Sequence, residues 1–239
     1  MIHFFNSPKL IRSKEDLEAA ALKYGILPFF SNSIRGFSVH ELAAPGMLFG
    51  ETNQDEGCWE WKGPVIREKT TAYGKFYNRK AGFISLPLLP HFLNYRRNAY
   101  PVKEGSTEEM ILEIIRENDG ISSTELKRWI HGPLNSDRTA EDLVTLSPSG
   151  SYKRKSIEGP LQRLQMGGHL LISNFEYKYT RRGERYGWGV AVYSTPELWF
   201  GRSFDTPGVS PEKSFEILTG HVKSLFPKVP DKIIANLLK

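Results

Sequence analysis

Two stretches of the chain interleave aromatic side chains with lysine and arginine. Residues 58–62 read Cys-Trp-Glu-Trp-Lys, and residues 73–80 read Tyr-Gly-Lys-Phe-Tyr-Asn-Arg-Lys. Rings spaced among cations can stack on nucleic-acid bases while the cations hold phosphates, and they can line a pocket for a base turned out of a duplex. The same pattern also fits strand residues that point into a core. The candidate pocket residues are Trp59, Trp61, Lys62, Tyr73, Lys75, Arg79, Arg96 and Arg97.

Glu60 lies between two tryptophans and is the candidate general acid or base in this stretch. Carboxylates held against apolar rings can transfer protons near neutral pH. The ordinary alternative is a solvent-facing strand residue or an ion-pair partner of Lys62 or Lys75. The sequence leaves both roles open, so the catalytic residue stays unknown and Glu60 is a weak candidate.

A second group of cations surrounds a predicted helix that ends near Gly167 and a hairpin that follows it. Arginine and glutamine can pair with guanine and adenine edges, whereas lysine and arginine on flanking segments contact phosphates. The alternative is a set of charges that only solvates a helix and a hairpin. The candidate DNA-binding residues are Lys153, Arg154, Lys155, Gln162, Arg163, Gln165, Lys178, Arg181, Arg182 and Arg185.

The positive charge of the chain is concentrated in these two regions. The formal net charge is +5 and the isoelectric point is about 9.2. Residues 62–103 hold nine basic residues and one acidic residue, and residues 151–190 hold eight basic and three acidic residues. Clustered cations of this kind are typical of a surface that binds nucleic acid.

The second half of the chain shows the order of elements that would position these side chains. Ser106 and Ser122 each precede a glutamate by three residues, which predicts a capping box at the start of two short helices. The third helix follows an insertion at residues 131–152, and residues 171–179 and 188–192 alternate as two strands around a charged turn. Helix, helix, helix and hairpin is the order of a winged helix, expected between about residues 107 and 193.

The first half gives weaker signals. Ser13 and Gly25 predict the two ends of a helix, and residues 88–95 also fit a helix. Residues 58–61, 72–76 and 83–86 read as short aromatic strands, with a turn at 78–82. The predicted fold class is α+β, either one winged helix or a tandem pair. The expected divisions are an aromatic-rich N-terminal region at 1–103, a winged-helix domain at 104–205 and C-terminal helices at 206–239.

Several segments together resemble a known family. They are Trp59-Glu60-Trp61-Lys62-Gly63-Pro64, Ala72-Tyr73-Gly74-Lys75-Phe76, Lys80-Ala81-Gly82-Phe83, Asn94-Tyr95-Arg96-Arg97, Ser173-Asn174-Phe175-Glu176-Tyr177 and Tyr186-Gly187-Trp188-Gly189-Val190. This set resembles bacterial AlkZ-related proteins, which are winged-helix relatives of the AlkZ/YcaQ DNA glycosylases. The resemblance implies tandem winged helices, DNA as partner and a link to excision of alkylated or crosslinked bases. The Gln-x-Gln or Gln-x-Tyr motif of those glycosylases does not occur in the N-terminal half, where Gln54 stands alone.

The remaining features narrow the class of protein. One cysteine and six scattered histidines predict neither a disulfide nor a metal site, and no cofactor motif occurs. No apolar run is long enough for a membrane span, and the N-terminus does not read as a signal peptide, so we expect a cytoplasmic protein. The leading prediction is a protein that binds double-stranded DNA, with a glycosylase-like enzyme as one alternative. The other is a protein-interaction or transcription-regulator module without catalysis.

Overall fold

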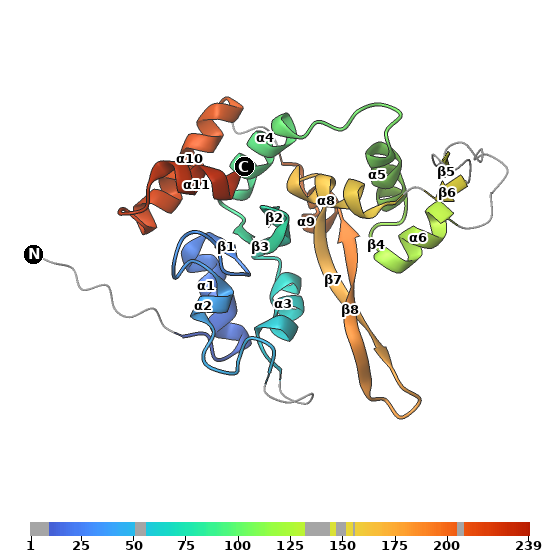
Figure 1. The fold of residues 1–239 in the computed structure, drawn as a ribbon, viewed down its shortest axis with the longest axis horizontal. Helices are drawn as coiled ribbons and strands as arrows, with labels where there is room; N and C mark the ends of the chain where they lie inside the picture. The colour runs from blue at the N-terminus through green and yellow to red at the C-terminus, as the bar shows by residue number, and fades with distance from the viewer. Residues whose placement is uncertain (1–9, 51–55, 132–143, 147–151, 155, 205–207) are drawn as a thin grey trace, which may run out of the picture.

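A computed structural model describes residues 10–50, 56–131, 144–146, 152–154, 156–204 and 208–239, and it shows an α+β protein (Figure 1). The first part of the chain contains α1 (Lys14–Tyr24), β1 (Ile26–Pro28), α2 (Val39–Leu42), α3 (Cys58–Arg67), β2 (Thr71–Tyr77), β3 (Lys80–Ser85) and α4 (Leu89–Ala99). The next part contains α5 (Thr107–Glu117), β4 (Ile121–Ser122), α6 (Ser123–His131), β5 (Val144–Leu146), β6 (Tyr152–Arg154), α8 (Glu158–Met166), β7 (Leu171–Tyr179) and β8 (Arg185–Ser194). The last part contains α9 (Pro196–Phe200), α10 (Pro211–Leu225) and α11 (Asp231–Leu238).

Two units of the chain repeat one order of elements. The first unit (residues 14–85) and the second unit (residues 107–194) both run helix, strand, helix, helix, strand, strand. Their antiparallel sheets have equivalent strand orders, β1-β3-β2 and β4-β8-β7. The second unit differs by the β5–β6 pair between α6 and α8. The first half therefore follows the same plan as the second, although its sequence pattern indicated this only weakly.

Serine side chains begin the helices where the sequence predicted them. The Ser13 hydroxyl accepts a hydrogen bond from the Asp16 N–H (3.2 Å) at the start of α1. Ser106 accepts from the Glu109 N–H (3.2 Å), and Glu109 accepts in return from the Gly105 N–H (2.6 Å). At α6 the two residues bond to each other, since Ser122 accepts from the Glu125 N–H and Glu125 accepts from the Ser122 N–H. These caps satisfy backbone donors that a helix cannot pair internally.

The prediction of a strand at residues 58–61 is wrong, because this segment is the first turn of α3. The Glu60 carboxylate accepts a hydrogen bond from the Gly57 N–H (3.4 Å), which caps the helix. The buried side chains of this helix are Cys58, Lys62, Val65 and Ile66, at helical spacing. The alternation of Trp59 and Trp61 suggested a two-residue period that the longer pattern overrides.

The two hairpins differ greatly in length. The first, β2–β3, turns at Asn78 and Arg79, whose φ angles of 47° and 65° are typical of a two-residue hairpin turn. The predicted turn at 78–82 was therefore too long, since β3 begins at Lys80. The second hairpin, β7–β8, has strands of nine and ten residues and projects beside α3 (Figure 1).

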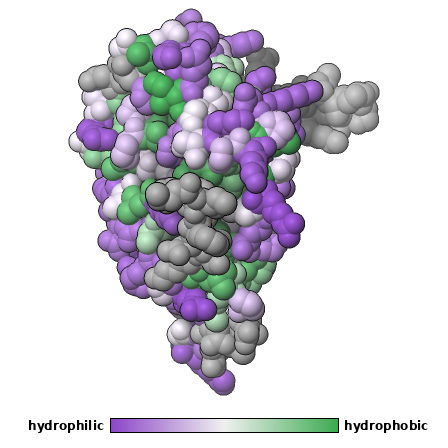
Figure 2. All heavy atoms as spheres, turned by 90° about the vertical axis from the view of Figure 1, so that its left-hand side faces the viewer, coloured by the Kyte–Doolittle hydropathy of each residue, from purple (hydrophilic) through white to green (hydrophobic). Residues whose placement is uncertain are grey.

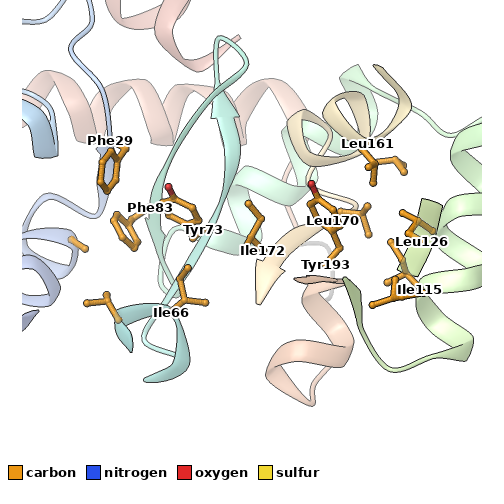
Figure 3. Close-up of a cluster of buried hydrophobic side chains, with 14 of the residues drawn as sticks. Phe29, Ile66, Tyr73, Phe83, Ile115, Leu126, Leu161, Leu170, Ile172 and Tyr193 are labelled. Atoms are coloured by element: carbon orange, nitrogen blue, oxygen red, sulfur yellow. The ribbon is translucent and has the colours of Figure 1, made fainter. Parts of the chain in front are cut away.

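One continuous core joins the two units. In the close-up, Phe29, Tyr73 and Phe83 of the first unit lie at one end and Leu126 and Leu161 of the second at the other (Figure 3). Ile172, near the start of β7, lies between the two groups and bridges them (Figure 3). Burial of this apolar surface stabilises both units at once.

The interface between the units is reciprocal. α8 packs on β2, α3 packs on β7, and β2 lies beside β7, so the third helix of each unit contacts the strand after the third helix of the other. Two polar contacts fix this arrangement. The Gln165 Oε1 accepts a hydrogen bond from the Lys75 N–H (3.1 Å), and Arg67 donates to Asn174 Oδ1 (2.8 Å).

The C-terminal helices complete a second core on the first unit. α10 packs on α4, and apolar residues of α10 and α11 bury Phe76 and Phe92. The face of the molecule on the left of Figure 1, where α1 and α10 lie, is largely hydrophilic with scattered hydrophobic areas (Figure 2). None of the helices in the described ranges is long and apolar enough to cross a bilayer.

Candidate nucleic-acid interface

The tip of the β7–β8 hairpin presents a cluster of exposed cations. The Thr180 N–H donates to the Glu184 carbonyl (2.8 Å) and closes the turn, in which Gly183 has a φ of 80° that favours glycine. Lys178, Arg181 and Arg182 are all exposed, and within the described part of the chain none of the three forms an ion pair. Their charges are therefore free to contact an anionic backbone.

Large aromatic side chains are exposed next to these cations. Tyr179 is 60% exposed, Tyr186 is 51% exposed and Trp188 is 73% exposed. The strand register places Lys178 opposite Tyr186 and Arg185 opposite Tyr179. Residues directly opposite in an antiparallel pair share a face of the hairpin and successive pairs alternate between faces, so Tyr186 lies beside Lys178 on one face and Tyr179 beside Arg185 on the other.

The hairpin is held against α3 by contacts that we call the hairpin seam, formed by Trp59, Glu60, Lys62 and Arg67 of α3 with residues of β7 and β8. The Arg185 guanidinium pairs with the Glu60 carboxylate (3.1 Å) and lies 4.4 Å from the centre of the Tyr177 ring. The ring centres of Trp59 and Trp188 are 5.7 Å apart, with the planes at 88°. These contacts fix the orientation of the hairpin relative to the first unit.

Lys62 occupies the inner part of the hairpin seam. Its ammonium lies 3.7 Å from the centre of the Trp59 ring and 4.3 Å from that of Phe175, and it donates a hydrogen bond to the Trp59 carbonyl. The residue is only 2% exposed. Burial lowers the pKa of Lys62 to about 7, while Glu60 acts to raise it and Arg185 to lower it. The sequence suggested a pocket-lining cation, whereas the structure shows an enclosed amine.

This burial predicts an unusual dependence of stability on pH. Between pH 7 and the ordinary lysine value of 10.5, the unfolded chain binds a proton at Lys62 that the folded chain does not. Stability must therefore rise with pH in this window, by about 2 kcal/mol between pH 7 and pH 9. Urea unfolding of the wild type and of Lys62→Met at these two pH values measures the effect. We expect the gain with pH in the wild type and its loss in the variant.

Lys75→Met removes an exposed lysine and serves as the control for a general effect of charge. It should keep the gain in stability that the wild type shows. A constant difference in unfolding free energy between the wild type and Lys62→Met at both pH values would contradict the prediction.

The third helix of the second unit, α8, does not offer the open base-reading face that the sequence suggested. Gln165 is 1% exposed, and its amide donates to the Leu161 carbonyl (3.1 Å) while accepting from the Lys75 N–H. Gln162 is half-buried and donates to the Arg79 carbonyl (3.5 Å). Arg163 is exposed but pairs with Glu108. Packing against the first unit is the reason, since the edge strand β2 covers this side of α8.

Two of the proposed pocket residues are core residues. Tyr73 is 1% exposed and packs against the Phe83 ring, with centres 4.8 Å apart. Arg96 is fully buried and donates to the carbonyls of Phe76 and Lys239. Tertiary contacts enclose both side chains, which were predicted as pocket residues.

The other pocket candidates lie apart from one another. Trp59 and Trp61 are half-buried on α3, whereas Lys75 and Arg79 are exposed on the first hairpin. Arg97 pairs with Glu197 (2.8 Å) on α9. Of the predicted set, Trp59 and Lys62 meet the second hairpin at the hairpin seam, and the centre of the buried Tyr73 ring lies 6.3 Å from that of the Phe175 ring of β7.

Glu60, the weak catalytic candidate, uses both carboxylate oxygens in structural contacts. One accepts from the Gly57 N–H and the other from Arg185, and the side chain is only 11% exposed. The ion-pair alternative is therefore what the structure shows, with Arg185 in place of Lys62 or Lys75. The proposed phosphate contacts at Lys153 and Arg154 fall on β6, of which the backbone alone is described, and Lys155 lies outside the described residues.

The aromatic residues that β7 and β8 contribute to this interface were not among the predicted site residues: Phe175, Tyr177, Tyr179, Tyr186 and Trp188. The first two alternate with Tyr179 on one strand, and this period-2 aromatic stripe was the signal that could have identified them. For Trp188 the sequence predicted a position on a strand and membership of one of the family-like segments, but no role at a site. Its high exposure depends on how far the hairpin extends, which the sequence does not show.

The described residues contain no group of three or more histidine, cysteine, aspartate or glutamate side chains that could hold a metal ion. Comparison with known proteins gives a match to one family model, described as AlkZ related, over residues 11–239. Neither the curated proteins nor the solved structures contain a match.

Proposed function

The chain belongs to the AlkZ-related family, and on this basis we propose that it binds double-stranded DNA through two winged-helix units with the β7–β8 hairpin as the main contact. The family connects the chain to glycosylase-like proteins of DNA repair. That connection makes DNA the expected partner, and the distribution of charge supports the same choice.

The repeated order of elements supports the winged-helix assignment. Three helices, a short strand before the second helix and a final hairpin occur in both units, with the short strand paired to the last strand each time. A winged helix uses its hairpin as the wing that contacts the DNA backbone. The β7–β8 hairpin is then a long wing, and β2–β3 is a short one.

The observation that carries the proposal is the group of unpaired cations at the tip of the long hairpin. Lys178, Arg181 and Arg182 lie in or next to the turn of the hairpin and are exposed. In many winged-helix proteins the third helix enters the major groove, by the logic of the helix-turn-helix. Here α3 and α8 are both engaged in the reciprocal interface, so the wing is the element left free to meet DNA.

The proposal is for DNA binding and assigns no catalytic residue. Glu60 holds Gly57 and Arg185, and the glycosylase motif has no counterpart in the N-terminal half of the sequence. Binding to another protein is the competing function, and the same experiment separates the two.

Fluorescence anisotropy with a labelled duplex tests the proposal. Binding that neutralises phosphates releases counterions, so affinity must fall steeply with salt. With three phosphate contacts at the wing, we expect the dissociation constant to rise roughly 40-fold between about 50 mM and about 200 mM salt. No binding at the lower salt concentration would defeat the proposal. Binding that ignores salt would defeat it as well, because phosphate contacts would then not hold the duplex, whereas the absence of binding would leave a protein partner as the alternative.

A further inference from the structure

The long hairpin combines exposed cations with exposed rings, and the rings need an explanation of their own. Exposed apolar side chains that gather in one region often mark a contact with a partner, whereas single ones need no such explanation. Phosphate contacts require only the cations. Three exposed rings, Tyr179, Tyr186 and Trp188, gather on this hairpin, and they favour a contact that backbone binding does not use.

Contacts with neighbouring rings hold the Trp188 side chain in place. Its ring meets the edge of Trp59, and Trp59 in turn meets the buried ring of Phe29, with centres 5.6 Å apart and planes at 81°. A row of rings therefore runs from the core to an indole that is 73% exposed. A braced ring loses little conformational freedom on binding, which favours stacking.

Among the exposed side chains of the hairpin tip, Arg181 and Arg182 could pair with guanine edges. Asparagine and glutamine are the usual partners of adenine, but Asn174 is engaged by Arg67 and Gln165 is buried. Tyrosine and tryptophan instead present ring faces. In an intact duplex each base face is covered by its neighbours, so a ring can stack only on a base that has left the helix.

We propose that the β7–β8 hairpin recognises unpaired, unstacked bases in DNA by stacking them on Trp188, Tyr186 and Tyr179 while the adjacent cations hold the phosphates. This inference rests on the proposed DNA binding and narrows its substrate class. The preferred ligand is a duplex interrupted by unpaired bases, chosen by its structure and not by its sequence.

Anisotropy titrations with a duplex, the same duplex carrying a central three-base bubble, and the bubble strand alone test the inference. Stacking one base is worth about 1–3 kcal/mol, so we expect the bubble to bind roughly 10-fold to 100-fold more tightly than the duplex. The single strand should bind more tightly than the duplex as well. All three DNA ligands are compared at the same salt concentration, because phosphate contacts with a duplex depend more steeply on salt than those with a single strand.

Variants assign the preference to the hairpin. Trp188→Ala should reduce the ratio of bubble to duplex affinity by roughly 10-fold, and Trp188→Phe should retain most of it because a ring face remains. Trp129 on α6, a tryptophan that is 46% exposed, supplies the matched control. Trp129→Ala should leave the ratio unchanged, whatever it does to affinity for all three ligands.

The outcomes separate this inference from the proposed function. Equal affinity of the wild type for bubble and duplex overturns the inference and leaves DNA binding intact. A bubble preference that survives Trp188→Ala together with Tyr186→Ala also overturns it. Failure to bind any of the three DNA ligands at low salt overturns both.

Discussion

Reversing the charge of the hairpin tip with Arg181→Glu and Arg182→Glu is expected to weaken duplex binding by roughly 100-fold at low salt. Both arginines are exposed at the far end of the hairpin, beyond its contacts with α3. The variant loses two phosphate contacts and adds repulsion between glutamate and phosphate. The slope of log affinity against log salt should fall by about 2, since each lost contact removes about 0.9.

The matched control reverses two lysines elsewhere. Lys228 and Lys232 are exposed near the C-terminal helices, and Lys228→Glu with Lys232→Glu changes the net charge by the same amount. The affinity of this double variant for the duplex should stay within a few-fold of that of the wild type. Similar losses in both double variants would mean that net charge governs binding, and the assignment of the hairpin would be wrong.

The largest effect on stability is expected for Arg96→Ala. The Arg96 guanidinium is fully buried, donates to the carbonyls of Phe76 and Lys239, and lies 5.4 Å from the centre of the Phe92 ring. Truncation removes both of these hydrogen bonds and leaves a cavity between β2, α4 and the end of α11, while the Lys239 carbonyl keeps the Tyr100 hydroxyl as a donor (3.1 Å). Costs of about 1–3 kcal/mol for each lost charged hydrogen bond give an expected loss of about 4 kcal/mol.

Arg97→Ala is the control, because Arg97 is the neighbouring arginine on the same helix. Its side chain is 32% exposed and its guanidinium pairs with the partly exposed Glu197. Such ion pairs contribute about 1 kcal/mol or less. Urea unfolding of the two variants measures both values. If Arg96→Ala costs no more than Arg97→Ala, the buried guanidinium is not what joins α4 to the end of α11.

Local signals in the sequence predicted the elements of the second unit well. Ser106 and Ser122 marked helix starts because a cap depends on residues within one turn. The period-2 pattern likewise predicted the β7–β8 hairpin. The α+β class and the family resemblance both followed from such short-range patterns, and the family match confirms the latter.

The candidate site was harder to predict, because burial depends on contacts between distant parts of the chain. The Gln165 amide is occupied by the Lys75 backbone, ninety residues earlier, and no local pattern announces this. Arg96 reads as a surface cation until the end of α11 covers it. The strand predicted at the start of α3 failed for a different reason. The buried positions of α3 do follow helical spacing in the sequence, but the alternation of Trp59 and Trp61 was given more weight.

Because the two hairpins differ in length, the two units of the molecule are not equivalent. DNA-binding proteins with two equivalent halves bind operators whose sequence reads the same on both strands, because the palindrome matches the two-fold symmetry of the protein. Here the halves share a plan, yet one hairpin ends in a two-residue turn at Asn78 and Arg79 and the other extends through strands of nine and ten residues. If each molecule engages DNA with its single long arm, it leaves an asymmetric footprint, and one strand polarity should be favoured over the other.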